Sequence, residues 1–133
     1  MYYIKFIMKI NLIKFVELLY YLSLIILLIL YLFPGSLIGY ILFGDLEKQP
    51  NLVKSSIGTS INHFFYFIYL ALLATFYNLK KNKFINSFYF LFLISILLEI
   101  SHFIIPKRAF EINDLLANAA GVLIIFLFRK IAK

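Results

Sequence analysis

Residues 99–121 read EISHFIIPKRAFEINDLLANAAG and hold nearly all the polar side chains of this chain that are candidates for a chemical role. Glu99 and His102 lie at the end of one apolar segment, and Asp114 and Asn118 lie at the start of the next. Ionisable side chains within membrane-length apolar segments are costly and rare, so they are candidates for a functional site. The stretch predicts two helices, joined by a short loop, with a polar site where they meet.

The composition is that of a membrane protein. Of the 133 residues, 64% are hydrophobic and 14% are charged, with a mean hydropathy of +0.97. A soluble domain is typically about half apolar and about a quarter charged. The length suits one domain, residues 1–133. The absence of cysteine excludes disulfides, thiolate metal sites and cysteine nucleophiles.

Four segments approach the length of about 20 helical residues that crosses a hydrocarbon core of roughly 30 Å. They are residues 15–33, 61–79, 84–104 and 112–128, of which the last is the shortest. Pro34 ends the first helix because proline cannot continue the hydrogen-bond ladder. The following residues, Leu37–Phe43, are apolar enough to lie along the membrane interface. We therefore predict an all-α, integral membrane four-helix bundle.

The basic residues predict the orientation of these helices. With the N-terminus in the cytoplasm, nine of the 13 basic residues lie on the inner side, and the outer loops hold the other four together with four acidic residues. By the positive-inside rule, both termini are cytoplasmic. The placement of the +7 formal charge at the ends of apolar segments indicates membrane anchoring and no nucleic-acid partner. The inner basic residues are Lys5, Lys9, Lys14, Lys80, Lys81, Lys83, Arg129, Lys130 and Lys133.

Residues 1–14 are expected to form a basic lead-in to the first span. A cleaved signal peptide is the alternative, but the apolar run from Phe15 to Phe33 is longer than the apolar region of a typical signal peptide, and no Ala-x-Ala-like site follows. Translation from either Met1 or Met8 is compatible with this organisation.

In this topology the conspicuous polar residues share one membrane depth, on the outer side. Three-residue spacing places Glu99 and His102 on one helical face, and four-residue spacing does the same for Asp114 and Asn118. We predict a polar pocket beneath the second outer loop, walled by the second to fourth helices, with Glu99 neutralised by Arg108 or a histidine. The predicted ligand-binding residues are His63, Glu99, His102, Arg108, Asp114 and Asn118.

Structural roles for the same residues remain open. Asp114 or Asn113 can cap the N-terminus of the last helix, and His102 can face lipid headgroups. Tyr66 and Tyr69 lie at a depth where they can border the pocket.

The order and spacing of these residues resemble the VanZ-like family of small bacterial membrane proteins. The pattern comprises Glu99, Pro106-x-Arg108, Asp114-x-x-x-Asn118-x-x-Gly121 and, upstream, Asn62-His63, and it spans about residues 60–125. His102 occupies a position at which the family usually has glutamine, which adds a titratable group. The resemblance implies action at the outer face of the cytoplasmic membrane, on lipid-linked or envelope material, and the family's namesake is associated with resistance to the glycopeptide teicoplanin.

Three functions are compatible with this pattern. The leading one is binding of an anionic membrane lipid or lipid-linked envelope precursor, gripped by the planar guanidinium of Arg108. The second is an enzyme that acts on an envelope phosphoester by acid–base chemistry, with Glu99, His63 and Asp114 as candidate catalytic residues. The third is a structural accessory subunit in which the polar groups serve helix packing. The oligomeric state stays open.

The sequence favours neither a metal nor a cofactor. Two histidines and two carboxylates can hold a divalent ion, but Glu-x-x-His is a far weaker signal than His-Glu-x-x-His. A channel is also disfavoured, because the inner halves of the four segments are apolar.

Overall fold

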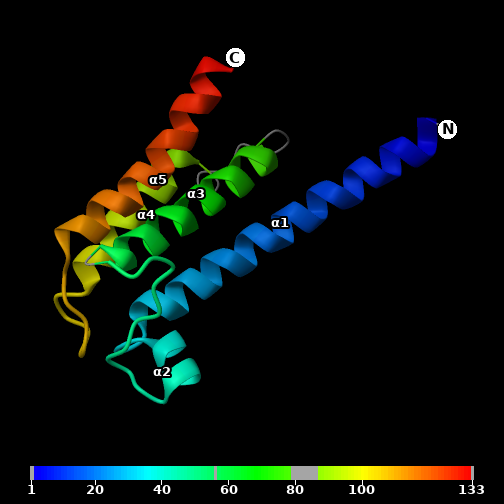
Figure 1. Ribbon diagram of the computed structural model, residues 1–133. Coiled ribbons are helices and arrows are strands. Elements are labelled where there is room, and N and C mark those ends of the chain that lie inside the picture. Colours follow the sequence, from blue (N-terminus) through cyan, green and yellow to red (C-terminus); the bar gives the residue numbers. More distant parts are fainter. Residues whose placement is uncertain (1, 56, 79–86, 133) are drawn as a thin grey trace.

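The computed structural model describes residues 2–55, 57–78 and 87–132. All regular structure in these residues is helical, which confirms the predicted all-α class. Helices α3, α4 and α5 lie side by side, whereas the N-terminal part of α1 diverges from them (Figure 1). The short α2 lies at the end of the molecule where α1 ends. The helices are α1 (Tyr2–Leu32), α2 (Leu37–Phe43), α3 (Gly58–Asn78), α4 (Phe88–Ser101) and α5 (Ile112–Ile131).

Among the described residues, three helices are long and apolar enough to cross a membrane, over Asn11–Leu32, Gly58–Phe76 and Ile112–Ile131. The helix that contains the last predicted segment is longer than that segment, because α5 continues past residue 128 and has 20 residues. Within the described part of the chain, α4 has 14 residues, which corresponds to about 21 Å at 1.5 Å per residue. Residue 79, which ends the second predicted segment, and residues 84–86, which begin the third, lie outside the described residues. The same holds for four of the inner basic residues, Lys80, Lys81, Lys83 and Lys133.

The segment expected along the membrane interface forms α2. Ser36 caps this helix by accepting a hydrogen bond from the backbone N–H of Gly39, and Gly44 ends it with a φ of 68°. A Cβ at Gly39 would overlap the carbonyl oxygen of Lys48, so the loop after α2 folds back against it. Four consecutive apolar side chains of α2 are exposed, namely Tyr40, Ile41, Leu42 and Phe43.

Packing of α5 against α3 and α4 forms the centre of the fold, and α1 packs mainly against α3. Gly121 permits a close approach of α5 to α3, since a Cβ there would lie 2.7 Å from the carbonyl oxygen of Phe64. The apolar core runs along these contacts and includes Tyr20, Leu27, Phe67 and Leu70. Most of the buried polar side chains instead gather at the end near α2, namely Ser60, Glu99, His102, Asp114 and Asn118.

Candidate functional site

Asp114 connects α5 to the start of α3. Its Oδ1 accepts a hydrogen bond from Ser60 Oγ at 2.5 Å, and its Oδ2 lies 3.3 Å from Nδ1 of His63. The last two atoms are close but are not aligned for a hydrogen bond. The interpretation of Asp114 or Asn113 as the N-cap is wrong, because Glu111 occupies that position and makes no side-chain cap bond. Asp114 lies inside the first turn and is 5% exposed.

Glu99 lies at the end of α4 and is fully buried. Its Oε1 accepts the backbone N–H of Glu111 at 3.1 Å and lies 3.2 Å from Nδ1 of His102. Of the two expected partners, the histidine is the one in contact. His102 is itself buried, so this side chain does not lie on the outer surface of the molecule.

Tyr31 of α1 belongs to the same cluster and was missed by sequence reasoning. Its hydroxyl donates to Oδ1 of Asn118 at 3.0 Å. Its ring stacks on the imidazole of His102, at 5.3 Å and 15°, and lies 5.1 Å from that of His63. The available signal was its position three residues before Pro34, at the predicted depth of the polar groups.

Arg108 reaches back from the loop between α4 and α5 to the end of α1. Its Nη2 donates to the carbonyl oxygen of Leu30 at 2.5 Å, and its Nε donates to that of Phe33 at 3.3 Å. Cations at a helix C-terminus are stabilised by the unpaired carbonyl groups there. Burial lowers the pKa of Arg108, yet a guanidinium stays charged in proteins and offers five N–H donors. Donors therefore remain for a ligand.

Burial also affects Glu111, which precedes α5. Its pKa is raised first by burial and then by the neighbouring charges of Asp114 and Glu99. The acidic groups at this end of the molecule thus lie close enough to disfavour one another's charge.

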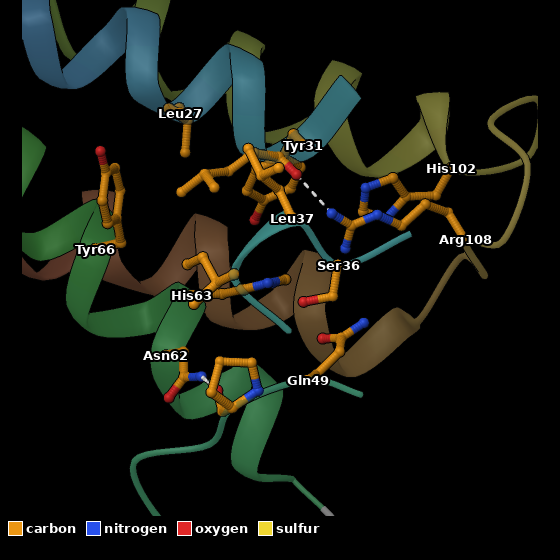
Figure 2. Close-up of a pocket in the computed structure, with 13 residues that line it drawn as sticks. Leu27, Tyr31, Ser36, Leu37, Gln49, Asn62, His63, Tyr66, His102 and Arg108 are labelled. Atoms are coloured by element: carbon orange, nitrogen blue, oxygen red, sulfur yellow. Dashed lines mark hydrogen bonds between the residues drawn. The ribbon is translucent and has the colours of Figure 1, made fainter. Parts of the chain in front are cut away.

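A pocket of about 140 Å³ lies beside this cluster. Figure 2 shows Arg108 and both imidazoles at its wall, with Leu27 and Leu37 contributing apolar surface. The wall differs from the predicted one, because α1, α2 and the loop after α2 contribute much of it. Glu99, Asp114 and Asn118 are not among the lining residues, which are Leu27, Leu30, Tyr31, Ser36, Leu37, Ile38, Gln49, Pro50, Asn62, His63, Tyr66, His102 and Arg108.

The two tyrosines singled out in the sequence have different positions. Tyr66 lines the pocket, and its hydroxyl donates to the carbonyl oxygen of Ser23. Tyr69 is absent from the lining, and its hydroxyl lies 3.0 Å from Oγ of Ser23. Only Tyr66 is therefore placed to contact a ligand.

The structure thus brings the six predicted site residues to one end of the molecule. One ligand atom from each of His63, Glu99 and Asp114 lies within 4.8 Å of the other two. Asn118 joins them through Tyr31, and Arg108 and His102 share the pocket wall with His63. In the described residues, four buried polar atoms of this cluster have no hydrogen-bond partner: Nδ1 of His63, Oε2 of Glu99, Nε2 of His102 and Nδ2 of Asn118.

The family model described as VanZ/LLP1 matches residues 5–133, nearly the whole chain. No curated protein and no solved structure matches the chain.

Proposed function

The chain belongs to the VanZ/LLP1 family, and on that premise we propose that it binds an anionic lipid or lipid-linked cell-envelope component in the pocket beside Arg108. The proposal places the chain in the bacterial cytoplasmic membrane as a multi-pass protein with α1, α3, α4 and α5 as its four spans and both termini inside. The pocket then lies at the outer-leaflet side. A link to glycopeptide resistance, the property associated with the family's namesake, belongs to the same proposal.

The charge of the pocket wall is the observation that carries this proposal. Arg108 lines the pocket, whereas no carboxylate appears among the described residues that line it. The remaining polar groups of the wall include the imidazoles of His63 and His102 and the amide of Asn62. Such a wall favours phosphate or carboxylate, which an arginine binds through its fork of N–H donors.

The apolar part of the wall supports an amphiphilic ligand. Leu27, Leu30, Leu37 and Ile38 line the pocket beside the polar groups. Its volume of about 140 Å³ is comparable with an engineered cavity of about 150 Å³ that binds benzene. The pocket therefore suits a headgroup, while acyl or prenyl chains would extend along the exposed apolar helix faces.

We expect Arg108→Ala to release the ligand. The wild-type chain, purified in detergent and examined by native mass spectrometry, should carry a lipid or lipid-linked phosphate that Arg108→Ala lacks. Loss of a charge-assisted hydrogen bond is worth about 1.5–3 kcal/mol, so affinity should fall about tenfold or more. The matched control is Lys107→Ala, which removes the same charge from the same loop at a residue outside the pocket lining.

Because Arg108 also binds the carbonyl groups that end α1, the folded state of each variant must be checked by circular dichroism and size exclusion. Arg108→Lys keeps the charge but loses the planar fork, so this variant should retain the ligand weakly. It tests the proposal if Arg108→Ala does not fold. A ligand that survives in folded Arg108→Ala would contradict the proposal, as would a wild-type chain that carries none. Either result would favour the packing role.

A second candidate, an enzyme acting on an envelope phosphoester, is favoured by the proximity of His63 and Asp114. The carboxylate can orient the imidazole, which lines the pocket and can act as a general base. Phosphate release from a short polyprenyl diphosphate tests this candidate. Catalysis is indicated if Arg108→Ala still releases phosphate while Glu99→Gln and Asp114→Asn do not. If the wild-type chain releases no phosphate, the result favours binding without catalysis.

A further inference from the structure

We propose that His63, Glu99 and Asp114 form a binding site for a divalent transition-metal ion, with Zn²⁺ as the best fit. The site lies behind the pocket wall and rests on no assumption about the ligand of the pocket. Three helices contribute, since His63 lies in α3, Glu99 in α4 and Asp114 in α5.

The distances between the three side chains suit a single ion. Three atoms that lie within 4.8 Å of one another leave a central point at most about 2.8 Å from each, and zinc binds nitrogen and carboxylate oxygen at about 2.0–2.2 Å. Nδ1 of His63 and Oδ2 of Asp114 lie 3.3 Å apart, close to the separation of about 3.4 Å expected for two ligands of one tetrahedral ion. Small side-chain rotations therefore complete the site.

The hydrogen bonds of the two carboxylates leave the required oxygens available. Oε1 of Glu99 is held by the backbone N–H of Glu111 and lies beside His102, while Oε2 is buried and has no partner. Oδ1 of Asp114 is held by Ser60, while Oδ2 faces His63. Ligating carboxylates are commonly oriented in this way by donors on their second oxygen.

The unpartnered atoms give the second, independent reason. Glu99 is fully buried, and burial of a polar atom without a partner is unfavourable. Nδ1 of His63 is likewise buried without a hydrogen bond. A divalent ion would bind both atoms and neutralise the two carboxylates. This ligand chemistry suits zinc, or manganese as the next candidate.

The proposal replaces the sequence-based expectation of no metal. Glu-x-x-His suggested His102 as the partner of Glu99 in a site, but the structure places one atom each of His63 and Asp114, from two other helices, within 4.8 Å of a carboxylate oxygen of Glu99. It also assigns His63 a different role from the acid–base candidate, because an imidazole nitrogen bound to an ion cannot accept a proton at that atom. Three protein ligands leave a fourth position for water.

Metal binding by the detergent-purified chain tests the proposal. After chelator treatment and equilibration with Zn²⁺, the wild-type chain should retain about one equivalent, as expected of a site with three protein ligands. Glu99→Gln and Asp114→Asn should each weaken zinc binding by more than about tenfold, since even outer-shell changes cost 10–100-fold. The matched control is Glu111→Gln, an exposed carboxylate at the same end of the molecule, which should retain the full equivalent.

A spectroscopic measurement on the wild-type chain tests the proposal even if the variants do not fold. Co²⁺ should substitute for Zn²⁺ and give the intense visible absorption of a tetrahedral site, and added Zn²⁺ should abolish it. Substoichiometric zinc in the wild-type chain, or the spectrum of hydrated cobalt, would overturn the proposal. Zinc retained in full by folded Glu99→Gln and Asp114→Asn would identify adventitious surface binding and would also overturn it.

Discussion

A Gly121→Leu variant is expected to lose the contact between α3 and α5 and to unfold at a much lower mole fraction of SDS than the wild-type chain. A Cβ at this position would lie 2.7 Å from the carbonyl oxygen of Phe64, 3.0 Å from Cβ of Phe67 and 3.1 Å from the backbone nitrogen of Ile68. Two of these atoms belong to the α3 backbone and cannot rotate aside. The helices must therefore separate, at an expected cost of about 3 kcal/mol or more.

The matched control is Ala120→Leu, one residue earlier on an exposed face of α5, where the larger side chain should change stability little. Gly121→Ala adds only the Cβ and should cost about 1–3 kcal/mol. SDS titration followed by circular dichroism measures all three variants. Equal midpoints for Gly121→Leu and Ala120→Leu would show that the two helices do not approach as closely at this position as the structure places them.

The same interface has a consequence for the candidate site. His63 directly precedes Phe64 in α3, and Asp114 lies on the same helix as Gly121, so the 3.3 Å contact between His63 and Asp114 requires the two helices to stay close. The glycine that the family resemblance includes in the motif therefore has a physical role that is separate from chemistry. It sets the distance between two helices whose polar side chains meet.

Much of the site could be predicted because helical periodicity and span order together fix depth. Once Glu99 was placed at the outer end of one helix and Asp114 at the outer start of the next, their proximity required only antiparallel packing. His63, at the start of another helix and on the same predicted side, follows by the same argument. The structure brings these three side chains together, whereas their binding role remains a proposal.

Other features leave a weaker pattern in the sequence, or none. Ser60 and Tyr31 are ordinary residues of membrane helices, and only their partners Asp114 and Asn118 reveal their roles. Arg108 binds backbone carbonyl groups, and such acceptors exist at the end of every helix whatever its sequence. The length of an apolar run also differs from the length of a helix, as α5 demonstrates by continuing to Ile131.

Tyr31→Ala is expected to be the most damaging single change on α1. The ring is 6% exposed, contacts the rings of His63, Phe67 and His102, and donates a hydrogen bond to Asn118. Removal of a buried aromatic side chain costs about 3–5 kcal/mol. The mole fraction of SDS at which half of the protein is unfolded should fall strongly. Zinc binding should also weaken if His63 moves.

Tyr31→Phe separates the two contributions of this side chain. It keeps the ring and removes only the hydroxyl, and interhelical hydrogen bonds in membranes contribute about 0.6 kcal/mol on average. Its midpoint should therefore stay near that of the wild-type chain, as should that of Tyr89→Ala, which removes an exposed ring from α4. If Tyr31→Phe is instead as unstable as Tyr31→Ala, the bond to Asn118 outweighs the ring contacts. Polar pairing, and not aromatic packing, would then hold α1 against the site.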